Sequence, residues 1–182
     1  MSDEQLINDI ISGNHAAFKS LMEKYQQQVF RTVMGFVHTK EDAEEVTQDV
    51  FIRIYQSLST FQHNAEFSTW LYRITVNASL NALRSNRKNR LLQSLETIFS
   101  LRSEEKTPLE ELEYAERNKR IGEAIDSLPE KQRTAFILSR YEELPQKKIA
   151  AVMNRSEGAI EQLLQRAKEN LNCLIILGVN KK

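Results

Sequence analysis

Apolar residues along this chain recur mainly at spacings of three and four, and the alternation typical of half-buried strands is absent. Such spacing places side chains on one face of an α-helix, because the helix turns once about every 3.6 residues. The pattern therefore predicts amphipathic helices that bury one face against each other. Four such faces stand out, within residues 18–36, 43–58, 71–82 and 160–174.

This periodicity fades in residues 93–112, where Ser, Glu and Thr surround Pro108. We interpret the segment as a linker. The sequence thus predicts an all-α protein with two small helical domains, residues 1–92 and 113–182, joined by this linker. We expect the free chain to be a flexible two-domain monomer. Prolines in a first helical turn indicate two further helix starts, at Thr107-Pro108 and at Leu128-Pro129-Glu130.

Composition agrees with this class. The 182 residues are 41% hydrophobic and include only 5 Gly and 3 Pro, which favours helix over sheet. Cys173 is the single cysteine, which permits no internal disulfide and fits a reducing compartment; we expect it in the core. The first residues lack the pattern of a leader peptide, and no window reaches the roughly 18 apolar residues of a membrane span. We therefore expect a soluble, cytoplasmic protein that is not itself a membrane protein.

The net charge of zero conceals a segregation of charges along the chain. Residues 41–60 carry a net charge of −4, and residues 61–90 carry +4. Residues 91–127 return to −4, and residues 128–182 carry +4. Two basic blocks separated by an acidic one indicate two surfaces suited to polyanions, although an uneven scatter of surface charge gives the same sums.

The first basic block contains a helix whose polar residues line up. Between Phe67 and Arg90 there are five basic residues and no acid. Arg and Lys neutralise phosphates, Asn makes paired contacts to a base edge, and an aromatic ring stacks on an unpaired base. The alternative is a solvated helix face with Trp70 in the core. We favour a nucleic-acid surface because one stripe about 80° wide holds Trp70, Arg73, Asn77, Asn81, Arg84 and Lys88.

The acidic block begins a different helix. Glu41 and Asp42 lie in its first turn, where negative charge suits the helix dipole, and that explanation suffices for them. Glu45 and Asp49 lie further along, four residues apart, with Gln48 beside them, and these like charges repel slightly. A basic partner surface would relieve the repulsion. A metal or acid/base site is the alternative, but no histidine lies nearby in the sequence.

A helix-turn-helix is indicated between Leu144 and Lys168. A short amphipathic helix is followed by Asn154-Arg155, and Ser156 is placed to cap a longer helix. The small Ala150 allows two helices to cross closely. An ordinary helical hairpin has a similar pattern, but the basic flanks favour DNA binding; they are Lys147, Lys148, Arg155 and Arg166.

Enzymatic chemistry has little support. The three histidines, His15, His38 and His63, and the one cysteine show no ligand spacing, and there is no glycine-rich phosphate loop. We expect no catalytic residue, no metal and no cofactor.

Three motifs in order resemble the extracytoplasmic-function (ECF) group of bacterial sigma factors, in the sigma-70 family. DAEEVTQDVF at 42–51 resembles the family's core-binding helix, and FSTWLYRITVN at 67–77 its promoter-melting segment. LPEKQR at 128–133 and RAK at 166–168 flank a match to its −35-binding domain. The resemblance covers nearly the whole chain apart from the linker.

The resemblance implies a factor that binds core RNA polymerase and directs promoter-specific transcription initiation. Residues 1–92 would be its region 2 domain and residues 113–182 its region 4 domain. The partners would be the β′ clamp coiled coil, the β flap, promoter DNA and an anti-sigma factor. The loop Phe61–Glu66 would capture an unstacked base.

The resemblance also implies roles for individual residues. Core-polymerase contacts would come from Asp42, Glu45, Gln48, Asp49 and Phe51. Contacts to the −10 element would come from Phe61, Asn64, Trp70, Arg73, Asn77, Asn81, Arg84 and Lys88. Contacts to the −35 element would come from Lys147, Arg155, Ser156, Gln162, Gln165 and Arg166.

The recognition helix departs from the family, because Ala159, Glu161 and Leu163 stand where many members carry Thr, Lys and Arg. Fewer phosphate contacts are then available, and Glu161 would repel the backbone or accept a hydrogen bond from a cytosine amine. The alternative function is a stand-alone helix-turn-helix regulator. That alternative explains residues 128–171, but it does not explain the Trp-bearing stripe or the acidic helix.

Overall fold

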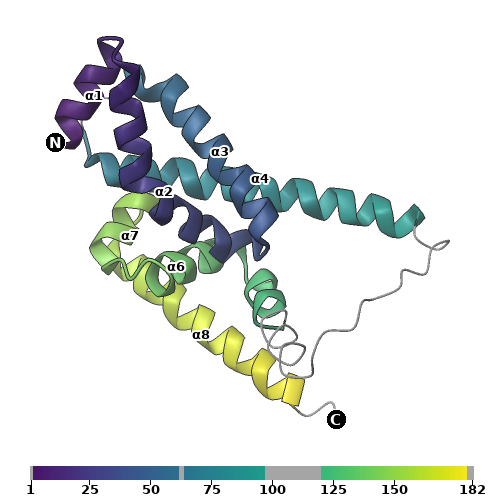
Figure 1. Cartoon of the computed structure of the whole chain (residues 1–182). Helices are drawn as coiled ribbons and strands as arrows, with labels where there is room; N and C mark the ends of the chain where they lie inside the picture. Colours follow the sequence, from purple (N-terminus) through teal and green to yellow (C-terminus); the bar gives the residue numbers. More distant parts are fainter. Residues whose placement is uncertain (1, 62–63, 97–119, 180–182) are drawn as a thin grey trace, which may run out of the picture.

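The computed structural model describes residues 2–61, 64–96 and 120–179, and for residues 86–96 and 174–179 it describes the backbone alone. The N-terminal half is a bundle of helices, and its longest helix extends beyond the others (Figure 1). Its elements are α1 (Asp3–Ile11), α2 (His15–Val37), α3 (Lys40–Ser57), the 3₁₀ turn η1 (Leu58–Thr60) and α4 (Phe67–Glu96).

The C-terminal half begins with helical residues 120–127 and continues with three labelled helices. They are α6 (Glu130–Arg140), α7 (Gln146–Met153) and α8 (Glu157–Val179). No strand occurs in any of the described ranges, which confirms the all-α prediction. The tight turn from α7 to α8 contains Asn154, whose left-handed φ of 52° ends α7. The predicted helix-turn-helix is therefore present.

Local sequence explains where several helices begin. The Thr39 hydroxyl accepts a hydrogen bond from the amide of Asp42 and so caps α3. Helix α1 was not anticipated, yet its start carries a recognisable signal. Ser2 and Gln5 form a reciprocal capping box, in which each side chain accepts a hydrogen bond from the other's backbone amide.

Asp3 fastens α1 to α2. Its carboxylate accepts hydrogen bonds from Lys24 Nζ at 2.5 Å and from the Tyr25 hydroxyl at 2.6 Å. Partial burial opposes ionisation of Asp3, but these two donors outweigh it and lower the Asp3 pKa. Burial, together with the nearby carboxylate, raises the pKa of Tyr25. The N-terminal helix is thus held by a charged contact as well as by its buried Leu6 and Ile7.

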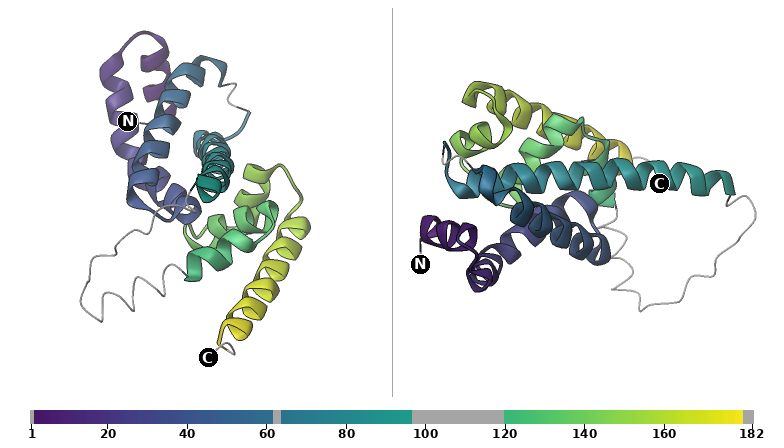
Figure 2. Two further views of the ribbon diagram at one scale, coloured as in Figure 1. Left: turned by 90° about the vertical axis from the view of Figure 1, so that its right-hand side faces the viewer. Right: turned by 90° about the horizontal axis from the view of Figure 1, so that it is seen from above.

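The two halves share one hydrophobic core. Buried residues of α2, α3 and α4 form a single cluster with those of α6, α7 and α8. Seen nearly end-on, α4 lies between the N-terminal helices and the C-terminal ones (Figure 2). One close contact is at Gly35 of α2, which faces Ile137 of α6. The structure therefore differs from the expected flexible arrangement, because the two domains pack directly on each other.

Some sequence expectations lie at or beyond the described residues. Helix α4 continues to Glu96, four residues into the expected linker, while residues 97–112 with Thr107-Pro108 lie outside the description. The helix start at Pro129-Glu130 is confirmed by α6.

Cys173 is exposed, so its expected place in the core was wrong: it lies on the solvent side of α8. None of the helices in the described ranges is long and apolar enough to cross a membrane.

The approach at Gly35 leads to a prediction about stability. A Cβ atom there would lie 2.8 Å from Cγ2 of Ile137, a β-branched and fully buried side chain that has little room to move. We expect Gly35→Ala to destabilise the protein by about 1–3 kcal/mol, the range typical of overpacking. Urea unfolding followed by circular dichroism measures this.

Gly158→Ala is the matched control. Gly158 is also helical, but a Cβ there meets nothing within 4 Å. We expect the control to be neutral or to gain up to about 1 kcal/mol from helix propensity. Equal midpoints for the two variants would show that the contact between the halves at Gly35 is loose.

Candidate nucleic-acid interface

Five described residues of the predicted stripe, which we call the −10 surface, project from α4: Trp70, Arg73, Asn77, Asn81 and Arg84. Trp70 and Arg73 are half-buried, and the other three are exposed. The remaining stripe residue, Lys88, lies on α4 where its side chain is outside the description. One helix thus brings the predicted residues onto one side, as the spacing required.

Trp70 belongs to an aromatic cluster at the start of α4. Its ring centroid lies 5.2 Å from that of Phe61 and 5.7 Å from that of Phe67, and Tyr25 packs on Phe67 at 5.4 Å. Phe61 itself is buried, so it supports the cluster and does not project outward. Asn64 is exposed, while residues 62 and 63 are outside the description. Both interpretations of Trp70 therefore apply in part: its ring packs in the aromatic cluster, but the side chain is only half-buried.

Two cations of the −10 surface contact the C-terminal half. Arg73 donates to the backbone carbonyls of Ala151 at 2.6 Å and Val152 at 3.3 Å, in the last turn of α7. Arg84 donates to Glu130 at 2.7 Å and to Asn81 at 3.3 Å. A cation at a helix C-terminus interacts favourably with the helix dipole. In this arrangement the two guanidinium groups are occupied by protein acceptors.

Asn77 lies apart from these contacts. It borders a shallow hollow of about 310 Å³ between α3 and α4, together with Arg53, Gln56, Ser57 and Ile74. Sequence reasoning did not select Arg53 or Gln56, because they belong to α3 and only the fold brings them beside Asn77. The hollow combines a cation, which suits a phosphate, with two amides, which suit a base edge, beside the apolar Ile74.

The predicted −35 residues all lie on the surface. Ser156 caps α8 by accepting a hydrogen bond from the amide of Ala159 at 3.3 Å. Gln165 donates to Glu169 at 3.1 Å along the same helix. The core side of α8 is marked by the buried Ile160 and Ala167. The residues predicted to contact the −35 element all have exposed side chains; they are Lys147, Arg155, Ser156, Gln162, Gln165 and Arg166.

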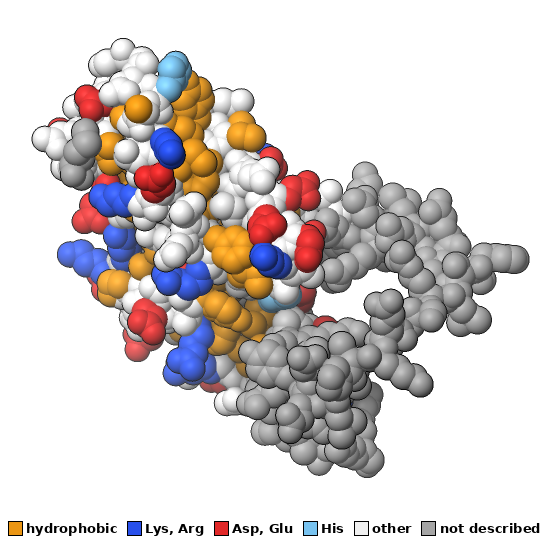
Figure 3. Space-filling model, in the orientation of Figure 1, with side chains coloured by type: hydrophobic (Ala, Val, Ile, Leu, Met, Phe, Trp, Pro, Cys, Tyr) orange, Lys and Arg blue, Asp and Glu red, His pale blue; other side chains and the backbone are white. Residues whose placement is uncertain are grey.

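The acidic helix presents a mixed face. Glu45, Gln48 and Asp49 are exposed on α3, while Asp42 is half-buried and Phe51 is buried. On this side of the molecule, hydrophobic side chains gather over α2 and α3, with acids at the N-terminal end of α3 (Figure 3). Nowhere in the described ranges do three or more His, Cys, Asp or Glu side chains gather as metal ligands.

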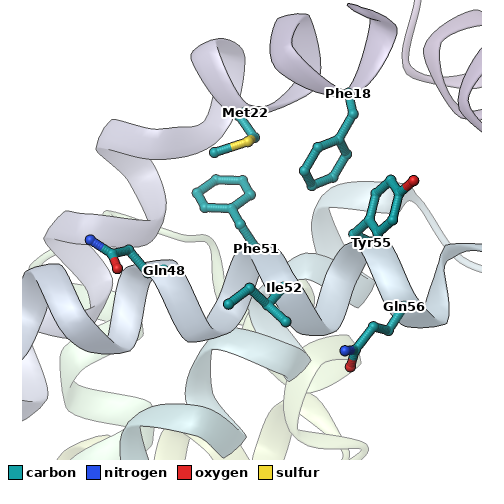
Figure 4. Close-up of a pocket in the computed structure, with 7 residues that line it drawn as sticks. All are labelled: Phe18, Met22, Gln48, Phe51, Ile52, Tyr55 and Gln56. Atoms are coloured by element: carbon teal, nitrogen blue, oxygen red, sulfur yellow. The ribbon is translucent and has the colours of Figure 1, made fainter. Parts of the chain in front are cut away.

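Beside these acids there is an apolar hollow of about 510 Å³ between α2 and α3. Ile52 and Tyr55 line it and are 54% and 44% exposed, so the hollow leaves large apolar side chains in contact with water. Sequence reasoning did not select these two residues, because each occupies an ordinary position in a predicted helix. Figure 4 shows Phe18 and Met22 of α2 opposite Phe51, and α3 supplying Gln48, Phe51, Ile52, Tyr55 and Gln56.

A buried ionic contact joins the two halves. Glu142, between α6 and α7, accepts hydrogen bonds from Arg31 Nε at 2.8 Å and Nη2 at 3.0 Å, and from the Tyr72 hydroxyl at 3.0 Å. These bonds raise the pKa of Arg31. Burial, with the Glu142 carboxylate beside it, raises the pKa of Tyr72. Sequence reasoning missed this group, because Arg31 and Glu142 are 111 positions apart.

Both halves match known families. Residues 21–89 match the family Sigma-70 region 2, and residues 118–171 match the family Sigma-70, region 4. The chain is 30% identical over 177 residues to the RNA polymerase sigma-H factor of Pseudomonas aeruginosa, covering 93% of this chain and 92% of that one. It is 29% identical over 179 residues to the ECF RNA polymerase sigma-E factor of Escherichia coli K12, covering 94% and 93%.

Two solved structures share the fold. One is CnrH in complex with the cytosolic domain of CnrY, with a TM-score of 0.71 at 22% identity, covering 96% of this chain and 97% of that one. The other is the sigma factor RpoE of Bartonella quintana in complex with the anti-sigma factor NepR, with a TM-score of 0.60 at 19% identity, covering 90% and 98%.

The contact between α7 and the start of α4 leads to a prediction about pH. The ammonium of Lys148 donates to Glu66 at 3.0 Å, and this bond lowers the pKa of Glu66 below its ordinary value of 4.5. A lowered pKa in the folded state means that the contact stabilises above the ordinary value and is lost as the pH falls through the lowered one. Lys148→Met should therefore move the Glu66 pKa back up, measured by NMR titration of the carboxyl carbon.

Lys147→Met removes the neighbouring exposed lysine and is the control. It should leave the Glu66 titration in place, because the bond to Glu66 comes from Lys148. An unmoved Glu66 titration in Lys148→Met would contradict the contact.

Proposed function

This chain belongs to the sigma-70 family, in the ECF group of RNA polymerase sigma factors, and from that membership we propose which of its surfaces bind polymerase and promoter. It is a transcription initiation factor that binds core RNA polymerase and directs it to promoters, and it is not an enzyme. One observation carries the assignment of surfaces: the chain pairs an exposed acidic and apolar face on α3 with a helix-turn-helix whose predicted DNA residues are all exposed.

The α3 face binds core polymerase. Glu45, Gln48 and Asp49 supply charge and hydrogen-bond acceptors, and the adjoining hollow with Ile52 and Tyr55 supplies apolar area. A partner helix with a basic edge and an apolar stripe would complement both the acidic part and the apolar part of this face. The β′ clamp coiled coil is that partner, and the β flap binds the C-terminal domain, residues 113–182.

The α4 face binds the −10 element. Trp70 supplies an aromatic platform for an unstacked base, and Arg73, Asn77, Asn81 and Arg84 contact the opened strand. The surface is complete only after Arg73 and Arg84 leave the acceptors that they contact in this arrangement.

The α8 face binds the −35 duplex in the major groove. Gln162 and Gln165 suit contacts to adenine, while Arg155, Arg166 and Lys147 contact phosphates. Ser156 caps α8, and the N-terminus of this helix lies near the phosphate backbone of the DNA. Glu161 is exposed in this region, so it disfavours close phosphate approach and favours a cytosine amine at its position.

An anti-sigma factor and a cytoplasmic location complete the proposal. Both solved structures named above are complexes, and in one of them the partner is described as an anti-sigma factor. For this chain we expect an inhibitor whose co-expression lowers promoter output without changing the amount of sigma factor. A genomic library in which no clone does so would contradict this part. The cytoplasm is the compartment where polymerase and chromosome meet.

The whole assignment is tested by mixing the purified chain with bacterial core polymerase. We expect co-elution on size exclusion, and transcription from a promoter library with start sites that share one −10 and one −35 pattern. Salt-sensitive binding to duplex DNA without any association with core polymerase would instead favour a stand-alone regulator.

The apolar hollow leads to a prediction about polymerase affinity. Ile52→Asp places a charge where the partner helix is expected to bury apolar surface, so we expect core binding to weaken about tenfold or more, as for a central interface residue. Competition binding to core polymerase measures it. Ile11→Asp is the control, since Ile11 is 52% exposed but does not line the hollow. Equal losses in both variants would place the interface elsewhere.

The α8 face leads to a prediction about promoter sequence. Gln162→Ala should relax the preference at one −35 base pair by about 1–3 kcal/mol, because a paired base contact is lost. Arg155→Ala should weaken all sequences alike and reduce the salt dependence, because a phosphate contact is lost. Transcription from a −35 library in the reconstituted holoenzyme distinguishes the two patterns. Unchanged preference at every −35 position in Gln162→Ala would remove that residue from the base contacts.

A further inference from the structure

Tyr55 lies at the edge of the apolar hollow on the α3 face. It is 44% exposed, and its ring packs edge-on against Phe18 of α2, with the two centroids 4.9 Å apart. Figure 4 shows the Tyr55 hydroxyl directed away from Met22 and Phe51, which also line the hollow. The part of Tyr55 that borders the hollow is therefore its apolar ring.

His15, the first residue of α2, holds the hydroxyl on that outer side. The Tyr55 hydroxyl oxygen lies 3.0 Å from Nδ1 of the His15 imidazole, and the two ring centroids are 6.2 Å apart. A hydroxyl both donates and accepts, so this hydrogen bond forms with either neutral tautomer of an imidazole. Tyr55 is thus held by α2 at two points, its ring by Phe18 and its hydroxyl by His15.

The backbone that carries His15 is fixed by local hydrogen bonds. Gly13 has a left-handed φ of 95°, which glycine adopts without steric cost, and its amide donates to the Ile10 carbonyl at 3.0 Å. The Asn14 side chain then caps α2 by accepting a hydrogen bond from the amide of Ala16 at 3.1 Å. The turn between α1 and α2 therefore sets the position of His15 without any partner protein.

The bond between His15 and Tyr55 matters more for orientation than for stability. Water can satisfy the hydroxyl of an exposed tyrosine, so a protein partner adds little to the free energy of folding. The bond does select one orientation among the rotamers open to a surface side chain. Ordering such a side chain during binding lowers affinity, and a side chain that is already ordered avoids this loss.

We propose that His15 is a positioning residue for core-polymerase binding, which holds Tyr55 at the edge of the hollow with its hydroxyl outside and its ring toward the partner helix. The inference rests on the proposed function, because it deepens the role of the α3 face. His15 does not itself line the hollow, so it acts through Tyr55. The occupant is the basic amphipathic helix of the β′ clamp, because the exposed Glu45 and Asp49 lie beside the hollow.

Two substitutions at His15 in the full chain test this role. His15→Ala removes the hydrogen bond, whereas His15→Asn keeps a donor and an acceptor as many bonds from Cα as Nδ1 is. In competition binding to core polymerase, we expect His15→Ala to lose about threefold to tenfold in affinity, the cost of ordering one side chain. We expect His15→Asn to stay close to the wild type, a rescue that a loss of bulk alone does not predict.

Tyr55→Phe completes a double-mutant cycle. It should lose about as much affinity as His15→Ala, and the double variant should lose no more than either, because each change removes the same contact. Ser20→Ala is the control, since Ser20 is an exposed residue of α2 that does not line the hollow. It should bind as the wild type does, and thermal melting checks that every variant is folded.

NMR of the free chain measures the orientation of Tyr55 without polymerase. We expect nuclear Overhauser effects between the rings of Tyr55 and Phe18 in the wild type and in His15→Asn, and their loss in His15→Ala. Unchanged ring contacts in His15→Ala would overturn the proposal, as would equal core affinities of His15→Ala and His15→Asn. An equal loss in Ser20→Ala would also overturn it.

The two readouts separate this proposal from the proposed function. If the wild type fails to bind core polymerase, the proposed function of the α3 face is overturned, and the role of His15 in binding is overturned with it. If the wild type binds and only the His15 variants behave as the wild type does, the proposed function stands and the positioning role of His15 is wrong.

Discussion

The burial of the Glu142 carboxylate is the constraint on which the arrangement of the two halves depends. A carboxylate away from water needs several donors, and here Arg31 supplies two hydrogen bonds and Tyr72 a third. Since the donors belong to α2 and α4, the turn between α6 and α7 must lie at the junction of those helices. That position brings Ile137 onto Gly35 and lays α7 along α4. The shared hydrophobic core and this polar contact at its edge therefore require the same arrangement of the two halves.

The segregation of charge along the chain acquires a second meaning in this arrangement. Positive charge on α4 suits a nucleic acid, but Arg73 and Arg84 also find acceptors on the C-terminal half. Charge-assisted hydrogen bonds to carbonyl and carboxylate oxygens resemble those to phosphate oxygens. Exchange between protein acceptors and DNA therefore keeps the number of such bonds nearly constant. In this arrangement, part of the positive charge on α4 is therefore compensated within the protein.

The α3 face illustrates why a protein interface differs from a nucleic-acid one. Its exposed acids exclude a polyanion, and the adjoining Ile52 and Tyr55 expose apolar area that water solvates poorly. The combination suits a basic amphipathic helix. In the C-terminal half, α8 exposes amides and cations but keeps Ile160 and Ala167 buried. Each face of this small chain is therefore specialised by the type of side chain that it leaves uncovered.

The sequence by itself predicted most of the helices, the helix-turn-helix and the exposed position of the residues that we propose contact the −35 element. Those features depend on local periodicity, on caps such as Ser156 and on motifs within a few tens of residues. Even α1, which was missed, had its signal in Ser2 and Gln5. Local patterns could not supply the pairing of Arg31 with Glu142, the hollow beside Ile52, or the approach of Arg53 to Asn77. These contacts join residues on different helices, and only the packing of the whole chain decided which side chains would meet and which would remain in water.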